Sequence, residues 1–200
     1  LSQQQAIWGQ DAIEEAGLQG SAQIRFSDYR DVTETAFDAI SSIGLTEHIG
    51  RANYPPYFSF LNDKLKPEGR MLNHTITRPD DTEPTHYRKS FINRYVFPDG
   101  ELSAPGVIMH AFNDSGFEIR HEENLREHYA LTLKHWCQNL EDHWEEAVAE
   151  AGLGTARVWR LYMAASRMGF ELNTIQLHQM LGVKLGPRGK SGMPLRAVFS

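Results

Sequence analysis

The chain has 200 residues, of which 40% are hydrophobic and 23% are charged, enough apolar content to bury a core and too much for a disordered chain. At this length we expect one domain, or at most one and a half. A formal net charge of −6 argues against general nucleic-acid binding through phosphate neutralisation. The single cysteine excludes an internal disulfide, and no apolar run approaches the roughly 20 residues that cross a bilayer.

The N-terminal part predicts a helix followed by two strands. Ser2 and Gln5 form a capping box, which marks the start of a helix. Residues 22–29 alternate apolar and polar side chains, which is typical of a strand. Residues 37–43 form a second, more apolar strand, and Glu47 follows it in a polar turn.

The rest of the chain continues to alternate between helices and strands. The predicted elements are a helix over 57–65, a strand over 70–77, a helix over 105–114, a strand over 117–121, helices over 125–151 and 155–170, and a last strand over 174–183. The polar loop at 78–89 is a candidate for a mobile lid. Such alternation predicts a mostly parallel sheet covered on both faces, and the last strand suits an antiparallel edge.

Ionisable side chains near the predicted strand ends are the candidate functional residues. Asp28 ends one strand, Glu47 follows the next, and His74 lies within a third. The carboxyl ends of parallel strands meet at one edge of the sheet, where doubly wound folds bind ligands. Each residue also has a structural interpretation. Asp28 can cap a strand end, and Glu47 can pair with Arg51 one helical turn on. His74 can be an ordinary core histidine.

Two further groups of side chains are ambiguous in the sequence. One contains His121, Glu122, Glu123 and His128, whose spacing does not converge on a single ion, so we predict no metal site. The other is an aromatic stripe made of Trp136, Trp144, Trp159, Tyr162 and Phe170. We expect most of this stripe to be core, with the alternative that part of it lines an apolar ligand tunnel.

Several blocks resemble the cyclopropane-fatty-acid synthase family, which includes the mycolic acid cyclopropane synthases. The blocks are SIGLTEHIGRANYPPYF, LKPEGRMLNHTI, FINRYVFPDGEL, LREHYALTLKHW and ARVWRLYMAASRMGF, in collinear order. The resemblance covers nearly all of residues 1–183. It implies the α/β fold of a class I S-adenosylmethionine-dependent methyltransferase, a Rossmann-like, mostly parallel sheet with an antiparallel last strand.

The resemblance also implies a reaction. The π electrons of a cis double bond in an acyl chain attack the sulfonium methyl of S-adenosylmethionine, and the resulting carbocation loses a proton to close a cyclopropane. A bicarbonate ion beside the sulfonium is the implied base. Relatives of the family give methyl-branched or methylene products instead, which is the alternative for this chain. A second alternative is a non-catalytic fragment that keeps the lipid-binding half.

The residues matched to the family's motifs fall into three implied groups. The catalytic group, which holds the bicarbonate, comprises Glu47, His74, Ile76, Tyr129 and the backbone of Ile43. The cofactor-binding group comprises Leu1, Ser2, Gln5, Asp28, Tyr29, Arg30 and Ser42. The acyl-binding group comprises Tyr57, Phe58, Phe97 and Leu133.

The chain departs from the family pattern in lacking the glycine-rich cofactor loop that should precede Leu1. We therefore expect residues 1–183 to be the C-terminal portion of a methyltransferase domain, without the first strands of the sheet, and residues 184–200 to be a basic mobile tail. Alone, such a fragment is expected to be inactive and to bind little cofactor.

The implied partners are an unsaturated phospholipid or acyl substrate and, transiently, a membrane surface, with no nucleic acid. The implied location is cytoplasmic, peripheral at the inner membrane face. The sequence does not fix the oligomeric state, for which a homodimer is one alternative.

Overall fold

The computed structural model describes residues 2–82 and 91–196, and the chain divides into two units, 1–35 and 36–200. The first unit contains helix α1 (Gln3–Glu15) and a 3-10 turn η1 (Tyr29–Asp31). Ser2 caps α1 as predicted, because its hydroxyl accepts the backbone N–H of Gln5 at 3.3 Å.

The predicted strand over 22–29 is wrong, because this segment forms no strand in the structure. Its backbone finds a helix instead of a neighbouring strand: the N–H of Ile24 donates to the side chain of Gln10 at 3.1 Å. The Ile24 side chain lies so close to Gly9 that a Cβ there would sit 2.4 Å from it. Alternating polarity alone therefore did not distinguish a strand from an extended segment packed on a helix.

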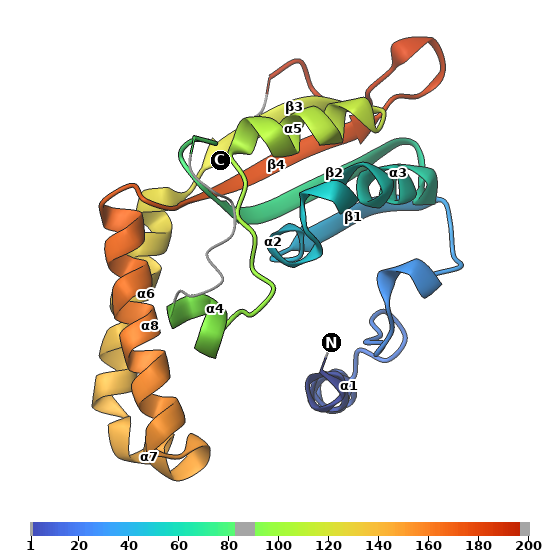
Figure 1. Cartoon of the computed structure of the whole chain (residues 1–200). Helices are drawn as coiled ribbons and strands as arrows, with labels where there is room; N and C mark the ends of the chain where they lie inside the picture. Colours follow the sequence, from blue (N-terminus) through green and yellow to red (C-terminus); the bar gives the residue numbers. More distant parts are fainter. Residues whose placement is uncertain (1, 83–90, 197–200) are drawn as a thin grey trace. The chain divides into compact units, whose positions relative to one another are not determined.

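The second unit is an α/β structure built on one sheet (Figure 1). Its strands are β1 (Phe37–Ile43), β2 (Leu65–Thr77), β3 (Phe117–Asn124) and β4 (Gln176–Lys184). The helices and 3-10 turns are α2 (Thr46–Ile49), η2 (Arg51–Asn53), α3 (Tyr54–Lys64), α4 (Phe91–Tyr95), α5 (Pro105–Asp114), α6 (Arg126–Asp142), α7 (Trp144–Ala151), α8 (Leu153–Glu171) and η3 (Pro187–Gly189). None of the helices in the described ranges could cross a membrane, since each is too short or too polar.

The described strands are ordered β1-β2-β4-β3 across the sheet. β1 and β2 are parallel, with Ile43 opposite His74, while β4 is antiparallel to both of its neighbours. Three strands therefore run in one direction and the last runs against them, which confirms the predicted sheet. The last strand is not at an edge, however, because it is inserted between β2 and β3.

Two other boundaries differ from the predictions. The helix expected over 125–151 is interrupted at His143, where α6 ends and α7 begins. The predicted tail at 184–200 starts inside the sheet, because Lys184 is the last residue of β4 and its ammonium donates to the carbonyls of Asn62 and Leu65 at 2.8 and 2.9 Å. These contacts tie the end of β4 to the end of α3. The mobility of the rest of the tail stays a prediction.

One face of the sheet is covered by α3 and α5, which pack side by side through aromatic rings (Figure 1). The ring centroids of Phe58 and Phe112 are 5.0 Å apart, and those of Phe112 and Phe117 are 4.4 Å apart. Gly182 of β4 lies directly beneath this cluster, since a Cβ at this position would be 2.8 Å from the Phe112 ring. The close packing of α5 on the sheet therefore depends on a residue without a side chain.

A second, smaller core lies on the opposite face, where α6 and α8 pack beside the end of the sheet. It contains Ala130, Leu133, Phe170 and Leu177, with Ile76, Tyr129, Met163 and Ile175 packed against them. Successive strand residues point to opposite faces, so Leu177 contributes to this core while Gly182 faces α5. The two cores place the carboxyl end of β2 next to the α6–α8 pair.

We predict that Gly182→Ala lowers the free energy of unfolding by about 1–3 kcal/mol, because the added methyl overpacks the buried Phe112. Urea denaturation measures the change. Gly154→Ala is the matched control, since no atom lies within 4 Å of a Cβ there and alanine favours the helix by up to about 1 kcal/mol. Equal stability of the Gly182 variant and the natural protein would contradict the packing described here.

Candidate active site

A cavity of about 790 Å³ lies in the 36–200 unit, at the carboxyl end of β2. Side chains from α2, α4, α6 and α8 complete its wall. The aromatic and aliphatic lining includes Phe97, Leu133, Trp136, Trp159, Tyr162 and Phe170. The polar lining includes Glu47, His48, Arg78, Asp80, Asn93 and Tyr129. An apolar chamber with a few polar groups at a strand end is the usual form of a small-molecule site.

Glu47 is a buried carboxylate in the wall of this cavity. Its Oε1 accepts the backbone N–H of Ile76 at 2.7 Å, and its own carbonyl accepts the N–H of Glu101 at 2.8 Å. Its Oε2 is also buried but has no hydrogen-bond partner within the described part of the chain. A buried carboxylate oxygen without a partner is costly, so this atom is the strongest candidate for a ligand contact.

The short helix α2 positions Glu47 because glycines turn the chain on both sides of it. Gly44 and Gly50 both adopt positive φ, at 63° and 76°. The buried hydroxyl of Thr46 donates to that of Thr75 at 2.8 Å, which fixes α2 against β2. The alternative ion pair between Glu47 and Arg51 does not form in the structure.

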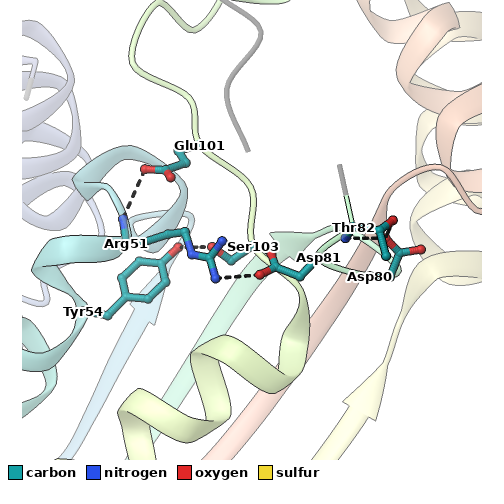
Figure 2. A network of polar contacts seen from close by, with 7 residues as sticks. All are labelled: Arg51, Tyr54, Asp80, Asp81, Thr82, Glu101 and Ser103. Atoms are coloured by element: carbon teal, nitrogen blue, oxygen red, sulfur yellow. Dashed lines mark hydrogen bonds and ion pairs between the residues drawn. The ribbon is translucent and has the colours of Figure 1, made fainter. Parts of the chain in front are cut away.

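Arg51 instead belongs to a polar network that holds the segments beside the cavity (Figure 2). Its guanidinium makes two bonds to Asp81, at 2.8 and 3.0 Å, and its backbone N–H donates to Glu101 at 3.2 Å. Nearby, the hydroxyls of Tyr54 and Ser103 are 3.1 Å apart. The network joins the segment after α2 to the segments that follow β2 and α4. Sequence reasoning missed this network because its members are far apart in the chain.

The predicted lid at 78–89 is described only as far as Thr82; its remainder lies outside the described residues.

His74 is half-buried beside this carboxylate, although its ring does not line the cavity. Burial lowers the pKa of His74, and the nearby charge of Glu47 opposes that shift. The amide nitrogen of Gln179 lies 3.1 Å from its Nδ1. An amide NH₂ can only donate, so Nδ1 accepts and the ring proton of neutral His74 is on Nε2. His74 is therefore a neutral ring with one N–H available to donate.

Tyr129 lines the same cavity from α6. Its ring packs edge-on against Phe170, with centroids 4.9 Å apart. Burial raises the pKa of the Tyr129 hydroxyl, and Tyr162 and the charge of Glu47 raise it further. The hydroxyl therefore stays protonated at neutral pH and can act as a hydrogen-bond donor.

Tyr162 is a cavity residue that sequence reasoning did not assign to the site. Burial raises the pKa of its hydroxyl, and a hydrogen bond with Ser166 partly offsets that rise. Its ring lies 5.7 Å from Phe97 and 5.4 Å from Trp159, centroid to centroid. The aromatic stripe was the available signal: Trp136, Trp159, Tyr162 and Phe170 line the cavity, whereas Trp144 does not.

The residues implied for acyl binding are divided between the two faces of the sheet. Phe97 and Leu133 line the cavity. Tyr57 and Phe58 are buried in the α3 core instead, where the hydroxyl of Tyr57 donates to Ser42 at 2.7 Å. The structure therefore brings Phe97 and Leu133 to Glu47, Ile76 and Tyr129, and places Tyr57 and Phe58 elsewhere.

The residues implied for cofactor binding are engaged in local contacts. Asp28 holds Arg30, whose guanidinium and backbone N–H bonds lower the pKa of Asp28 to about 2, and the Arg30 guanidinium lies 5.9 Å from the centre of the Tyr29 ring. Ser2 and Gln5 form the cap of α1. Leu1 lies outside the described residues. Ser42 bonds to Tyr57, and Ile43 is exposed at the end of β1.

The charged cluster considered for a metal is used in another way. Glu122 lies 3.4 Å from the Nε2 of buried His178, whose Nδ1 is 2.7 Å from the hydroxyl of Thr77. These bonds join β3, β4 and β2. In residues 2–82 and 91–196 the structure shows no group of three or more His, Cys, Asp or Glu side chains placed to hold a metal ion.

This fold is shared with known cyclopropane synthases. Residues 1–180 match the family described as mycolic acid cyclopropane synthetase, and the chain belongs to that family. It is 58% identical to the probable fatty acid methyltransferase Rv3720 of Mycobacterium tuberculosis, over 98% of this chain and 46% of the relative. It is 38% identical to a probable fatty acid methyltransferase of Pseudomonas putida, over 97% of this chain and 50% of the relative.

A solved structure agrees with the family assignment. The mycolic acid cyclopropane synthase CmaA1, complexed with SAH and CTAB, superposes with a TM-score of 0.81 at 25% identity, covering 90% of this chain and 67% of CmaA1. The resemblance inferred from the sequence blocks and the predicted fold class are thus confirmed. The chain spans about half the length of the curated relatives it matches.

We predict that His74 makes the protein sensitive to acid. The pKa of His74 in the folded protein lies below the ordinary value of 6.5. Above that pH the side chain is therefore neutral in both the folded and the unfolded protein. As the pH falls through 6.5 the unfolded chain binds a proton first, and stability is lost until the folded-state pKa is passed. In His74→Gln, the loss of urea stability between pH 7.5 and 5 should be smaller than in the natural protein.

His110→Gln is the control, because His110 is exposed and forms an ion pair with Asp114 on its own helix. The loss of stability at low pH that remains in both variants includes the contribution of His178, whose pKa is also lowered by burial. An unchanged pH dependence in His74→Gln would contradict the assignment of a half-buried neutral ring.

Proposed function

We propose that this chain forms the acyl-binding and proton-removing part of an S-adenosylmethionine-dependent enzyme that adds a one-carbon group to the cis double bond of an unsaturated acyl chain in a phospholipid. The observation that carries the proposal is Glu47, a buried carboxylate with an unpartnered oxygen in the wall of an otherwise largely apolar cavity. Family membership supplies the reaction class.

The cavity suits a long apolar chain that develops a positive charge. Phe97, Leu133 and Tyr162 provide an apolar and aromatic wall, and rings of this kind attract a cation through their faces. Water exclusion protects a carbocation from hydration, and a fixed negative charge nearby stabilises it. Glu47 is the buried carboxylate in this wall, beside Ile76.

S-adenosylmethionine supplies an electrophilic methyl group when it is bound. The double bond provides the electron pair for the new carbon–carbon bond, and the carbon–sulfur bond breaks with its electrons left on sulfur. Loss of a proton from the transferred carbon then closes a cyclopropane. The chain's own contribution is to bind the acyl chain, exclude water and hold the group that takes the proton.

The residues around Glu47 fit a small oxyanion such as bicarbonate as that proton acceptor. Glu47 Oε2 is a buried acceptor without a partner in the described residues, and it suits the O–H of such an ion. Protonated Tyr129 lines the cavity and offers one donor to its oxygens, and neutral His74, whose ring lies outside the lining, carries a second donor on Nε2. The donors would stabilise the charge of the ion, and the Glu47 acceptor would orient its O–H.

A methyl-branched or methylene product is the alternative within the same class. The relative at 58% identity is named a probable fatty acid methyltransferase, which favours this alternative, whereas the family and CmaA1 are named for cyclopropane synthesis. Incubation with oleoyl phospholipid, followed by mass spectrometry and ozonolysis of the product, separates them. A cyclopropane resists ozonolysis, and an exocyclic methylene is cleaved. A flat titration with S-adenosylmethionine in the whole protein would support a non-catalytic lipid-binding role instead.

We predict that Glu47→Gln lowers turnover about 100-fold or more while the affinity for S-adenosylmethionine stays within twofold. The amide keeps the size of the side chain and its bond to Ile76, but it removes the charge and turns an acceptor into a donor. Steady-state kinetics and calorimetric titration provide the two readouts. Glu123→Gln, an exposed carboxylate at the end of β3, is the control. Turnover within a few-fold of the natural enzyme would refute the role of Glu47.

A further inference from the structure

Arg78 is a buried arginine in the lining of the cavity, with only 9% of its surface exposed. It directly follows Thr77, the last residue of β2, and its backbone N–H donates to the carbonyl of Ser103 at 3.1 Å. Alternate residues along a strand share a face, and Arg78 lines the cavity together with Ile76. The arginine is therefore fixed two residues beyond the one that holds Glu47.

The polar and apolar parts of the lining come largely from different elements. α6 and α8 supply most of the aromatic and aliphatic wall, whereas the end of β2 and the segment after it supply Arg78, Pro79 and Asp80. α2 and α4 add His48 and Asn93. A ligand with an apolar chain and one polar end matches a cavity divided in this way.

The two carboxylates of the lining are oriented by other groups. The Oδ1 of Asp80 accepts the backbone N–H of Thr82 at 3.0 Å and its hydroxyl at 2.6 Å (Figure 2). These bonds are the main cause of the lowered pKa of Asp80, to which the charge of Arg78 contributes less. The Oε2 of Glu47 has no hydrogen-bond partner in the described residues, so Arg78 does not bind it. The lining thus carries a buried cation and, separately, a buried acceptor.

Two other arginines differ from Arg78 in lying outside the lining. Arg94 of α4 is exposed, and its guanidinium lies 5.4 Å from the centre of the Tyr95 ring. The guanidinium of Arg51 is paired with Asp81 at 2.8 Å. Arg78 is therefore the cation that the described part of the lining offers to a bound molecule.

We propose that Arg78 determines substrate specificity by binding an oxyanion at one end of the acyl substrate, either the phosphate of a phospholipid or the carboxylate of a free acyl chain. The inference rests on the proposed function, because it takes the cavity to be the acyl site, and it adds the residue that recognises the anionic end. A guanidinium presents a planar fork that makes two parallel hydrogen bonds to such groups. The anion would also offset the cost of burying the cation.

The natural protein provides a test without any variant. In the whole protein, tryptophan fluorescence reports binding, because Trp136 and Trp159 line the cavity. The ligands are saturated, so they lack the double bond that reacts. Stearate is compared with methyl stearate, and monostearoyl phosphatidylglycerol with monostearoylglycerol. In at least one pair the anionic ligand should bind about tenfold more tightly or better, and that pair identifies the source of the oxyanion. Equal affinities within both pairs would overturn the proposal.

Arg78→Gln should remove this preference. Loss of the charge-assisted hydrogen bonds should weaken binding of the anionic ligand about tenfold to hundredfold. The neutral ligand should bind within about twofold, which shows that the cavity is intact. Arg78→Lys keeps the charge without the fork and should retain part of the preference. Arg94→Gln, the matched control outside the lining, should retain all of it. Equal weakening of charged and neutral ligands in Arg78→Gln would make Arg78 a structural residue and refute the proposal.

Transfer assays separate this inference from the proposed function. A whole protein that binds anionic ligands through Arg78 but transfers no one-carbon group to any unsaturated lipid would overturn the proposed function and leave this site intact. Transfer with equal kcat/KM for charged and neutral unsaturated lipids, unchanged in Arg78→Gln, would overturn the role of Arg78 and leave the proposed function intact.

Discussion

The hydrogen bond from the backbone of Ile76 to the carboxylate of Glu47 is the contact on which the candidate site depends. It joins α2, which follows β1, to the carboxyl end of β2, so the parallel pairing of these strands sets where the charge lies. It satisfies one carboxylate oxygen and leaves the other to face the cavity wall without a partner in the described residues. Charge burial of this kind costs free energy, which the packing of α2 against β2 must offset.

The surroundings of that carboxylate are divided between the sheet and the α6–α8 pair. The sheet supplies Ile76 and, beside it, the neutral ring of His74, whereas α6 supplies Tyr129 and α8 supplies Tyr162. Burial moves the pKa of the histidine down and those of the tyrosines up, so these three groups are uncharged near neutral pH and can donate protons in hydrogen bonds. The site thus combines buried Glu47 and buried Arg78 with neutral donors in a largely apolar chamber.

Local sequence patterns predicted the helices and strands that bury one face. They did not predict features that depend on contacts between residues distant in the sequence. The strand at 37–43 and the helix at 105–114 have the predicted bounds, because their apolar spacing and their Pro and Gly boundaries are local. The segment at 22–29 has the same alternation but packs on α1. Glu47 could be proposed from its place after a predicted strand, but its role and that of Tyr129 came only through the family blocks. The Arg51–Asp81 pair could not be predicted, since thirty residues separate its members. Helical spacing alone did not reveal which aromatic residues face the cavity.

The position of β4 has a consequence for the order in which the protein assembles. Of the described strands β4 comes last in the chain, yet it is the hydrogen-bonded neighbour of both β2 and β3. During translation β3 therefore has no neighbour in the described sheet until β4 has left the ribosome. Such long-range pairing slows folding and prolongs the exposure of apolar surface.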